Sequence, residues 1–216
     1  MASGLPLCAR IIVVSAAMLT AAAPLVANAQ QSRTFMTKAY PVSRGGQNIA
    51  CSLEFEAGIA DFVYRQGAVS LVAGSLTFYG YRGDEVQPFV GLKLVVKDMD
   101  TEGQELTARA PAQISVFGKN GKSLSAGYYG GGDGETPGST IASFAFDQSF
   151  DSVIASISQD DRLVVAFNRT KGGMDVRIPV DLKVGVGGQS EHQKETALEF
   201  LTCVNDLAQE LEAKLK

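Results

Sequence analysis

The chain has 216 residues, and its 19 Lys and Arg against 23 Asp and Glu give a formal net charge of −4. This mild acidity, with basic residues scattered rather than clustered, argues against nucleic acid or an anionic membrane as a partner. The length is that of one ordinary domain and suffices to bury a hydrophobic core.

Residues 1–29 have the three-part pattern of a cleavable export signal. Arg10 supplies the positive charge, residues 11–19 are almost entirely apolar, and small residues follow as far as Ala27-Asn28-Ala29. The apolar run is shorter than the ~20 residues that span a bilayer, and no second long apolar stretch follows it. We therefore expect cleavage after Ala29, no membrane span afterwards, and a periplasmic or secreted protein of bacterial type.

The next segment differs in texture from the rest of the chain. Residues 30–47 are polar and contain Pro41 and Gly45-Gly46, which predicts a flexible N-terminal arm. Residues 48–216 are expected to form a single β-rich domain. It begins at residues 49–56, where apolar residues alternate with small or polar ones, as in a half-buried strand. Longer strands rich in Val, Leu, Phe and Tyr follow. They are expected at residues 69–81 and 89–97.

Two turn motifs predict hairpins in the second half of the chain. The Asn120-Gly121 pair between residues 112–117 and 123–129 is a strong hairpin signal. A further strand and a second hairpin are also expected. The strand lies at residues 140–146, and the hairpin joins residues 163–168 to 174–182 through 170–173.

Two segments have helical periodicity instead. Apolar residues near 150–158 predict a short amphipathic helix with Ser149 as its N-cap. Ser190-Glu191-His192-Gln193 has a capping-box pattern that opens a terminal helix over residues 190–215. The predicted fold is therefore mainly β: an antiparallel β-sandwich or open barrel, with the C-terminal helix packed on the sheet.

Removal of the signal leaves two cysteines, Cys51 and Cys203. In an exported domain these most simply form one disulfide, which would close a loop of 152 residues and stabilise the fold by roughly 5 kcal/mol. Two buried free thiols are the alternative. A thiolate metal site needs three or four ligands, and the chain has a single histidine, His192. We expect no metal and no cofactor.

Residues 128–138 form the most unusual stretch, with five glycines, two aromatic residues and two acids. Tyr128, Tyr129, Asp133 and Glu135 could form a flexible binding loop in which the tyrosines stack on a sugar or a peptide. A long, mobile connection between strands is the alternative interpretation.

Asp98, Asp100 and Glu102 resemble the first half of a calcium-binding loop. The motif requires a bidentate Glu at its twelfth position, where this chain has Arg109. The flanking segments also have strand patterns rather than helical ones. An acidic hairpin turn is the preferred interpretation, with calcium as a weak alternative.

No catalytic motif stands out. His192 lies in the first turn of a predicted helix, away from its apolar stripe, and a Gly-x-Ser-x-Gly elbow is absent from the sequence. Four aspartates could supply acid–base pairs, but their positions suit a helix cap and a turn better. They are Asp147, Asp151, Asp160 and Asp161. Enzymatic activity is therefore uncertain, and the sequence favours its absence.

The sequence thus predicts an exported, non-enzymatic domain that binds another component of the envelope or the exterior, most simply a protein. Two alternatives stay open. One is a small-ligand or glycan-binding protein that uses residues 128–138, and the other is a carboxylate-dependent hydrolase.

Overall fold

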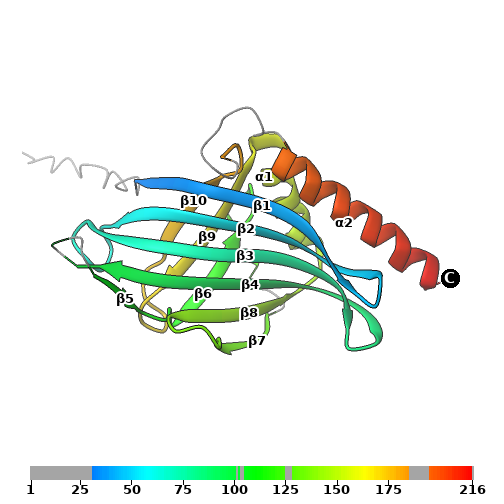
Figure 1. Ribbon diagram of the computed structural model, residues 1–216, viewed down its shortest axis with the longest axis horizontal. Helices are drawn as coiled ribbons and strands as arrows, with labels where there is room; N and C mark the ends of the chain where they lie inside the picture. Colours follow the sequence, from blue (N-terminus) through cyan, green and yellow to red (C-terminus); the bar gives the residue numbers. More distant parts are fainter. Residues whose placement is uncertain (1–30, 101, 103–104, 125–127, 185–194, 216) are drawn as a thin grey trace, which may run out of the picture.

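The computed structural model describes residues 31–100, 102, 105–124, 128–184 and 195–215 (Figure 1). Within these residues the chain is mainly β, with antiparallel sheets and two helices, which confirms the predicted fold class. The long strands of the larger sheet form one layer, and the smaller sheet lies behind them in Figure 1.

The larger sheet contains seven strands in the order β1-β2-β3-β4-β8-β7, and β5 also pairs with β4. Its first four strands are consecutive antiparallel neighbours of 13 to 15 residues each. Their bounds are β1 Ser32–Arg44, β2 Gln47–Asp61, β3 Ala68–Arg82 and β4 Glu85–Met99. The remaining strands are shorter: β5 Leu106–Ala108, β7 Tyr128–Asp133 and β8 Ser139–Ala145.

The smaller sheet has the order β10-β9-β6, with β6 at Gln113–Phe117, β9 at Arg162–Asn168 and β10 at Val176–Asp181. The predicted hairpin between β9 and β10 is confirmed. Helix α1 (Gln148–Asp160) contacts β9, β6 and α2, and helix α2 (Glu195–Lys214) lies against β1, β2 and β3. Residues 190–194, where the terminal helix was predicted to begin, lie outside the described residues.

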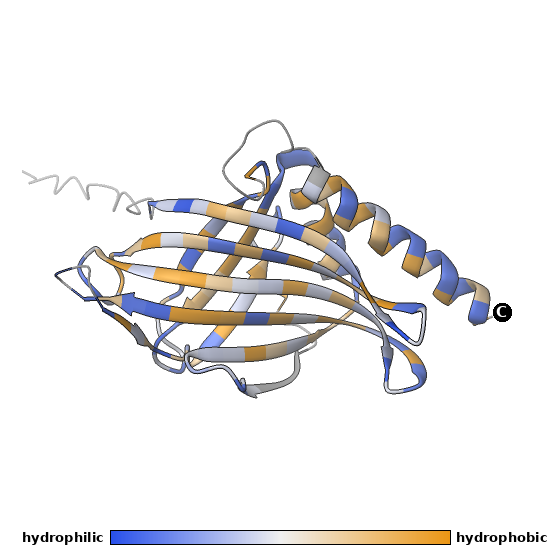
Figure 2. Cartoon of the chain, in the orientation of Figure 1, coloured by the Kyte–Doolittle hydropathy of each residue, from blue (hydrophilic) through white to orange (hydrophobic). Residues whose placement is uncertain are grey.

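The core fills the space between the two sheets. Side chains alternate along each strand, so every second residue of β2 and β4 points inward, and Figure 2 shows this alternation of apolar and polar segments. Leu53, Phe55, Leu92 and Leu94 are almost completely buried from the larger sheet. They belong to the same cluster as inward-facing residues of the smaller sheet and of both helices. Burial of each such side chain contributes about 1.5–3 kcal/mol.

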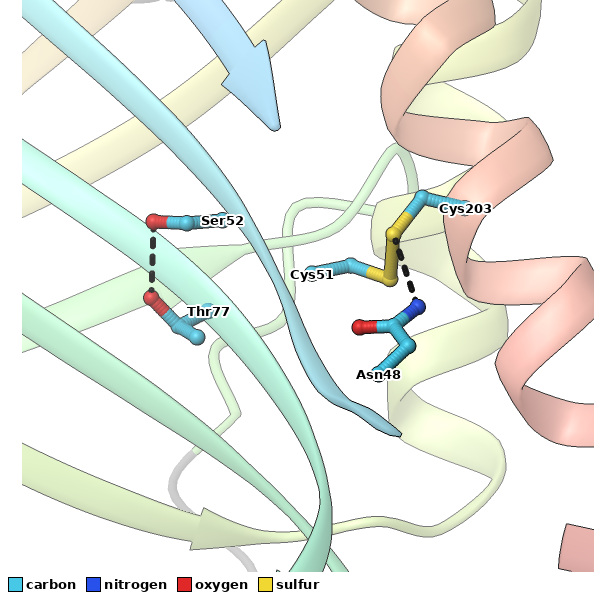
Figure 3. The surroundings of a disulfide bond; sticks show 5 residues. All are labelled: Asn48, Cys51, Ser52, Thr77 and Cys203. Carbon is cyan, nitrogen blue, oxygen red and sulfur yellow. Dashed lines mark hydrogen bonds between the residues drawn. A yellow bond between two sulfur atoms is a disulfide. The ribbon is translucent and has the colours of Figure 1, made fainter. Parts of the chain in front are cut away.

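Helix α2 lies close to the larger sheet because β3 carries Gly80 at the contact. A Cβ atom at that position would lie 3.0 Å from Leu211 Cδ1 and 3.2 Å from Leu207 Cδ1. The predicted disulfide joins Cys51 of β2 to Cys203 of α2, with 5.9 Å between their Cα atoms (Figure 3). The C-terminal helix is therefore both packed on the sheet and covalently attached to it.

Side-chain hydrogen bonds connect β1 to the smaller sheet. The hydroxyl of Ser32 donates to the Pro179 carbonyl at 3.0 Å, and the Asp181 N–H donates to Thr34 Oγ1 at 2.9 Å. These two bonds join β1 to β10 where the described strands form no backbone ladder. We call this contact the β1–β10 seam.

The structure corrects the prediction of a flexible arm at residues 30–47. Most of this segment is β1, which pairs with β2 from Ser32 to Arg44. Pro41 is compatible with this pairing because β1 is the edge strand of the larger sheet, and an edge strand tolerates a residue without an N–H. Gly45 and Gly46 have positive φ angles and form the turn into β2.

Two local predictions also change. The N-cap of α1 is Asp147 rather than Ser149. The hydroxyl and the N–H of Ser149 both donate hydrogen bonds to the Asp147 carboxylate, and these bonds lower the pKa of Asp147. The turn at Gly121 closes a single bridge between Phe117 and Ser123, not a full hairpin. The chain then leaves the smaller sheet, and β7 pairs with β8 in the larger one.

Candidate binding site

A cavity of about 550 Å³ lies between the edge of the smaller sheet and the β7–β8 hairpin of the larger sheet. We call it the inter-sheet cleft. It forms because β6, the last strand of the smaller sheet, pairs with β9 and not with β8. The cleft is lined by Pro111, Ala112, Gln113, Ile114, Ser115, Gly132, Asp133, Thr140, Ile141, Ala142, Phe144 and Lys171.

The floor of the cleft is apolar and belongs to the hydrophobic core. Ile114 of β6 and Ala142 and Phe144 of β8 are each no more than 3% exposed, yet they line the cavity. Ile141 also borders the cavity, but it alternates with Thr140 and Ala142 along β8, and its side chain is 39% exposed on the outer face. A ligand in the cleft would therefore contact core side chains from both sheets.

One end of the cleft is held by a hydrogen bond between the two sheets. The Thr140 hydroxyl of β8 donates to the Pro111 carbonyl at 2.7 Å, and this contact is buried. Further along β6, the Val116 carbonyl accepts a hydrogen bond from the N–H of Leu124, which follows the strand and whose side chain is buried. The segment that follows β6 therefore folds back against the strand beyond the cleft.

Two charged side chains of opposite sign lie on opposite walls. Asp133 is the last residue of β7 in the larger sheet, and Lys171 lies in the turn between β9 and β10 of the smaller sheet. Both are exposed, and neither has an ion-pair partner among the residues that the structure describes. Both charges are thus available to a ligand.

The β7–β8 hairpin shows why this stretch is rich in glycine. Gly138 has φ of +79°, and a Cβ atom there would lie 2.8 Å from the Val96 carbonyl oxygen, so the turn requires glycine. Gly132 is different, because a Cβ atom there would meet nothing within 4 Å. Gly132 pairs with the exposed Ile141, so its backbone borders the cleft while a Cβ atom there would point to the outer face of the sheet.

The structure places the four residues of the predicted binding loop differently. Tyr128 and Tyr129 lie in strand β7, but their side chains are outside the described part of the structure. Asp133 lines the cleft, whereas Glu135 is exposed in the following turn and is not among the lining residues. Residues 128–133 are thus a paired strand rather than the first part of a loop.

Asp98, the first residue of the weak calcium candidate, is engaged in a different interaction. It lies in β4 and accepts hydrogen bonds from Arg169 at 2.7 and 3.0 Å and from the Ser70 hydroxyl at 2.8 Å. Arg65 adds an ion pair at 3.5 Å. Asp98 is therefore a structural partner of two arginines and not a free oxygen donor.

The rest of that segment forms a turn. Glu102 is exposed, and the Asp100 N–H donates to the Glu105 carbonyl as the chain turns from β4 to β5. Strands β4 and β5 on either side of this segment pair with each other, as the hairpin-turn interpretation expects. Among the described residues, no group of three or more His, Cys, Asp or Glu could hold a metal ion.

Three of the candidate acid–base aspartates have structural roles. Asp147 caps α1, Asp160 pairs with Lys119 at 2.9 Å, and Asp161 pairs with Lys183 at 3.4 Å. Asp151 lies in the first turn of α1, where a negative charge complements the helix dipole. His192 lies outside the described residues.

A second groove, of about 800 Å³, runs between α2 and β1 beside the disulfide. Its walls include Glu199, Asp206 and Glu210 of α2, together with Leu198, which is 64% exposed. Asn48 donates to Cys203 Sγ at 3.6 Å at this place (Figure 3). This groove is lined mainly by partly or fully exposed side chains, whereas the inter-sheet cleft reaches the core. The cleft is therefore the stronger candidate.

No helix in the described part of the chain is long and apolar enough to cross a membrane. Comparison of the chain with protein-family models, with curated proteins and with solved structures finds no match.

Proposed function

We propose that this chain is an exported, non-enzymatic binding protein that holds its ligand in the inter-sheet cleft. The observation that carries the proposal is the cleft itself, a cavity of about 550 Å³ with a core-lined floor. Cavities that bind small molecules have volumes of about 300–1,000 Å³, are mainly apolar, and carry a few well-placed polar groups. The cleft has each of these properties.

The placement of the candidate carboxylates supports binding rather than hydrolysis. Hydrolysis by a carboxylate pair needs two acids that face the same substrate. Asp133 is the carboxylate among the lining residues, whereas Asp147, Asp160 and Asp161 are bound to a helix end or to lysines.

Export is supported by two features. Residues 1–29 have the pattern of a signal peptide, and the chain folds with a Cys51–Cys203 disulfide, a bond that persists mainly in oxidising compartments. The ligand would accordingly be a component of the periplasm or the exterior. Fractionation of the source cells tests this part of the proposal, and full-length protein retained in the cytosol would contradict it.

Ala112→Phe tests the cleft. Ala112 lines the cleft two residues before Ile114 and is exposed, so an aromatic side chain there would occupy the cavity without replacing a core residue. We expect the variant to lose the fluorescence that wild-type protein induces in anilinonaphthalene sulfonate, a probe that fluoresces in apolar sites, while its melting temperature stays close to that of wild type.

Thr107→Phe is the matched control. It adds the same aromatic ring at an exposed residue of β5 that is not among the lining residues of the cleft. This control should bind the probe as wild type does. If wild-type protein binds no probe, or if Ala112→Phe and Thr107→Phe bind it equally, the cleft is not the binding site.

A further inference from the structure

We propose that the inter-sheet cleft recognises short apolar peptides through their free, charged ends. This inference rests on the proposed function and adds the class of ligand. It is carried by the two opposite charges that the fold places on facing walls of one apolar cavity.

The charges match a zwitterion. Asp133 at the end of β7 can accept hydrogen bonds from an ammonium group, and Lys171 in the β9–β10 turn can donate to a carboxylate. Neither side chain has an ion-pair partner within the described residues, so a ligand would not have to break an existing pair. A short peptide carries both end groups on one molecule.

The interior of the cleft matches the middle of such a peptide. Ile114, Ala142 and Phe144 form an apolar floor against which its side chains can lie. Strand β6 is an edge strand that pairs with β9 among the described strands, so its backbone groups on the side of the cleft can bond the amide groups of an extended peptide.

Other classes of small ligand fit less well. A sugar needs aromatic surfaces to stack on, and among the described side chains of the lining Phe144 is the aromatic one, with its ring only 2% exposed. A fatty acid could pair its head group with Lys171 but has no cation for Asp133, so it would use only one of the two charges. A phosphate ligand would find a single cation, Lys171, instead of a cluster.

The experiment is calorimetric titration of the exported protein. It is expressed from the full chain, residues 1–29 included, so that export and disulfide formation can occur. Four probes are compared: trileucine with free ends, its N-acetylated form, its C-terminal amide, and dodecanoate. We expect trileucine to bind most tightly and each blocked end to weaken binding about twofold to fivefold, as for loss of an exposed charge pair.

Two variants assign each end to its wall. Asp133→Asn should weaken trileucine binding but leave the N-acetylated form unchanged, because that probe has already lost the ammonium group. Lys171→Met should weaken trileucine binding but leave the amide unchanged. Equal binding of blocked and free peptides would overturn the inference, as would tighter binding of dodecanoate than of trileucine.

Failure of this inference is distinguishable from failure of the proposed function. If trileucine does not bind but anilinonaphthalene sulfonate binds to wild type and not to Ala112→Phe, the cleft is a binding site for another class of ligand. If neither probe responds to Ala112→Phe, both proposals are wrong.

Discussion

Arg169 joins three parts of the chain that are far apart in sequence. Its guanidinium donates to Asp61 at the end of β2 at 3.0 Å and to Asp98 of β4 at 2.7 and 3.0 Å. Asp61 is completely buried and also accepts the N–H groups of Val63 and Tyr64. The cluster therefore ties the β9–β10 hairpin of the smaller sheet to the larger sheet at one end of the molecule.

Replacement of Arg169 by methionine should strongly destabilise the fold. The apolar variant would leave the buried Asp61 carboxylate without a cation and the nearly buried Asp98 with Arg65 alone, and loss of one partner of a buried pair costs about 3–5 kcal/mol. Urea denaturation measures the change. Arg44→Met is the control, because the Arg44–Asp84 pair is exposed and 3.9 Å long, so its loss should cost less than about 1 kcal/mol. Similar losses in both variants would contradict a structural role for the Arg169 cluster.

Sequence patterns do not predict this cluster. Arg169 lies 71 and 108 residues from its two aspartates, and their contact depends on which strands the topology brings together. Asp98 drew attention only for its acidic neighbours, which suggested a turn and weakly a calcium loop. The same holds for the cleft: Asp133 was included because of its unusual local sequence, whereas Lys171 and Ile114 carry no local signal of a binding site. They line a cavity only because β6 and β8 remain apart.

Elements were more predictable than single contacts, because periodicity is a local property. Strands β2, β3, β4 and β8 of the larger sheet, the β9–β10 hairpin and both helices follow from apolar alternation or helical spacing, whereas β5 and β7 do not. Strand β1 did not, since Pro41 and two glycines resemble an arm, and its pairing depends on β2. The helix periodicity also placed Cys203 correctly, on the flank of α2 that faces β2.

Loss of the disulfide should lower the free energy of unfolding of the whole domain. The bond joins β2 of the larger sheet to α2 and involves no strand of the smaller sheet. The Cys51–Cys203 bond joins residues 152 apart, and in the chain-entropy model a loop of that length contributes about 5 kcal/mol. We expect the double variant Cys51→Ala with Cys203→Ala to lose stability of this order in urea denaturation. Wild-type protein treated with a reductant provides the comparison and should show a similar loss. A double variant within 1 kcal/mol of wild type would show that apolar packing alone holds α2, through contacts such as Leu207 and Leu211 with Gly80.

At the scale of the whole molecule, the two sheets meet differently at their two sides. On one side, the β1–β10 seam joins them through Ser32 and Thr34. On the other side, β6 and β8 stay apart, and Thr140 bridges them at one end of the inter-sheet cleft. The prediction of a sandwich or an open barrel was right in class, but which side opens depends on strand pairing that no local pattern reports.

Because the two sides differ, a substitution at the β1–β10 seam should change stability alone, whereas one at the cleft should change both stability and ligand binding. Thr34→Val and Thr140→Val each remove one hydroxyl at nearly constant shape, and each leaves a buried or half-buried backbone partner without its hydrogen bond. Both variants should therefore lose about 1–3 kcal/mol of stability in urea denaturation. Only Thr140→Val also releases the Pro111 wall from β8, so only this variant should bind anilinonaphthalene sulfonate more weakly than wild type. If Thr34→Val weakens probe binding as much as Thr140→Val does, the cleft responds to global loosening of the sandwich. The bond between Thr140 and Pro111 would then have no specific part in holding the site.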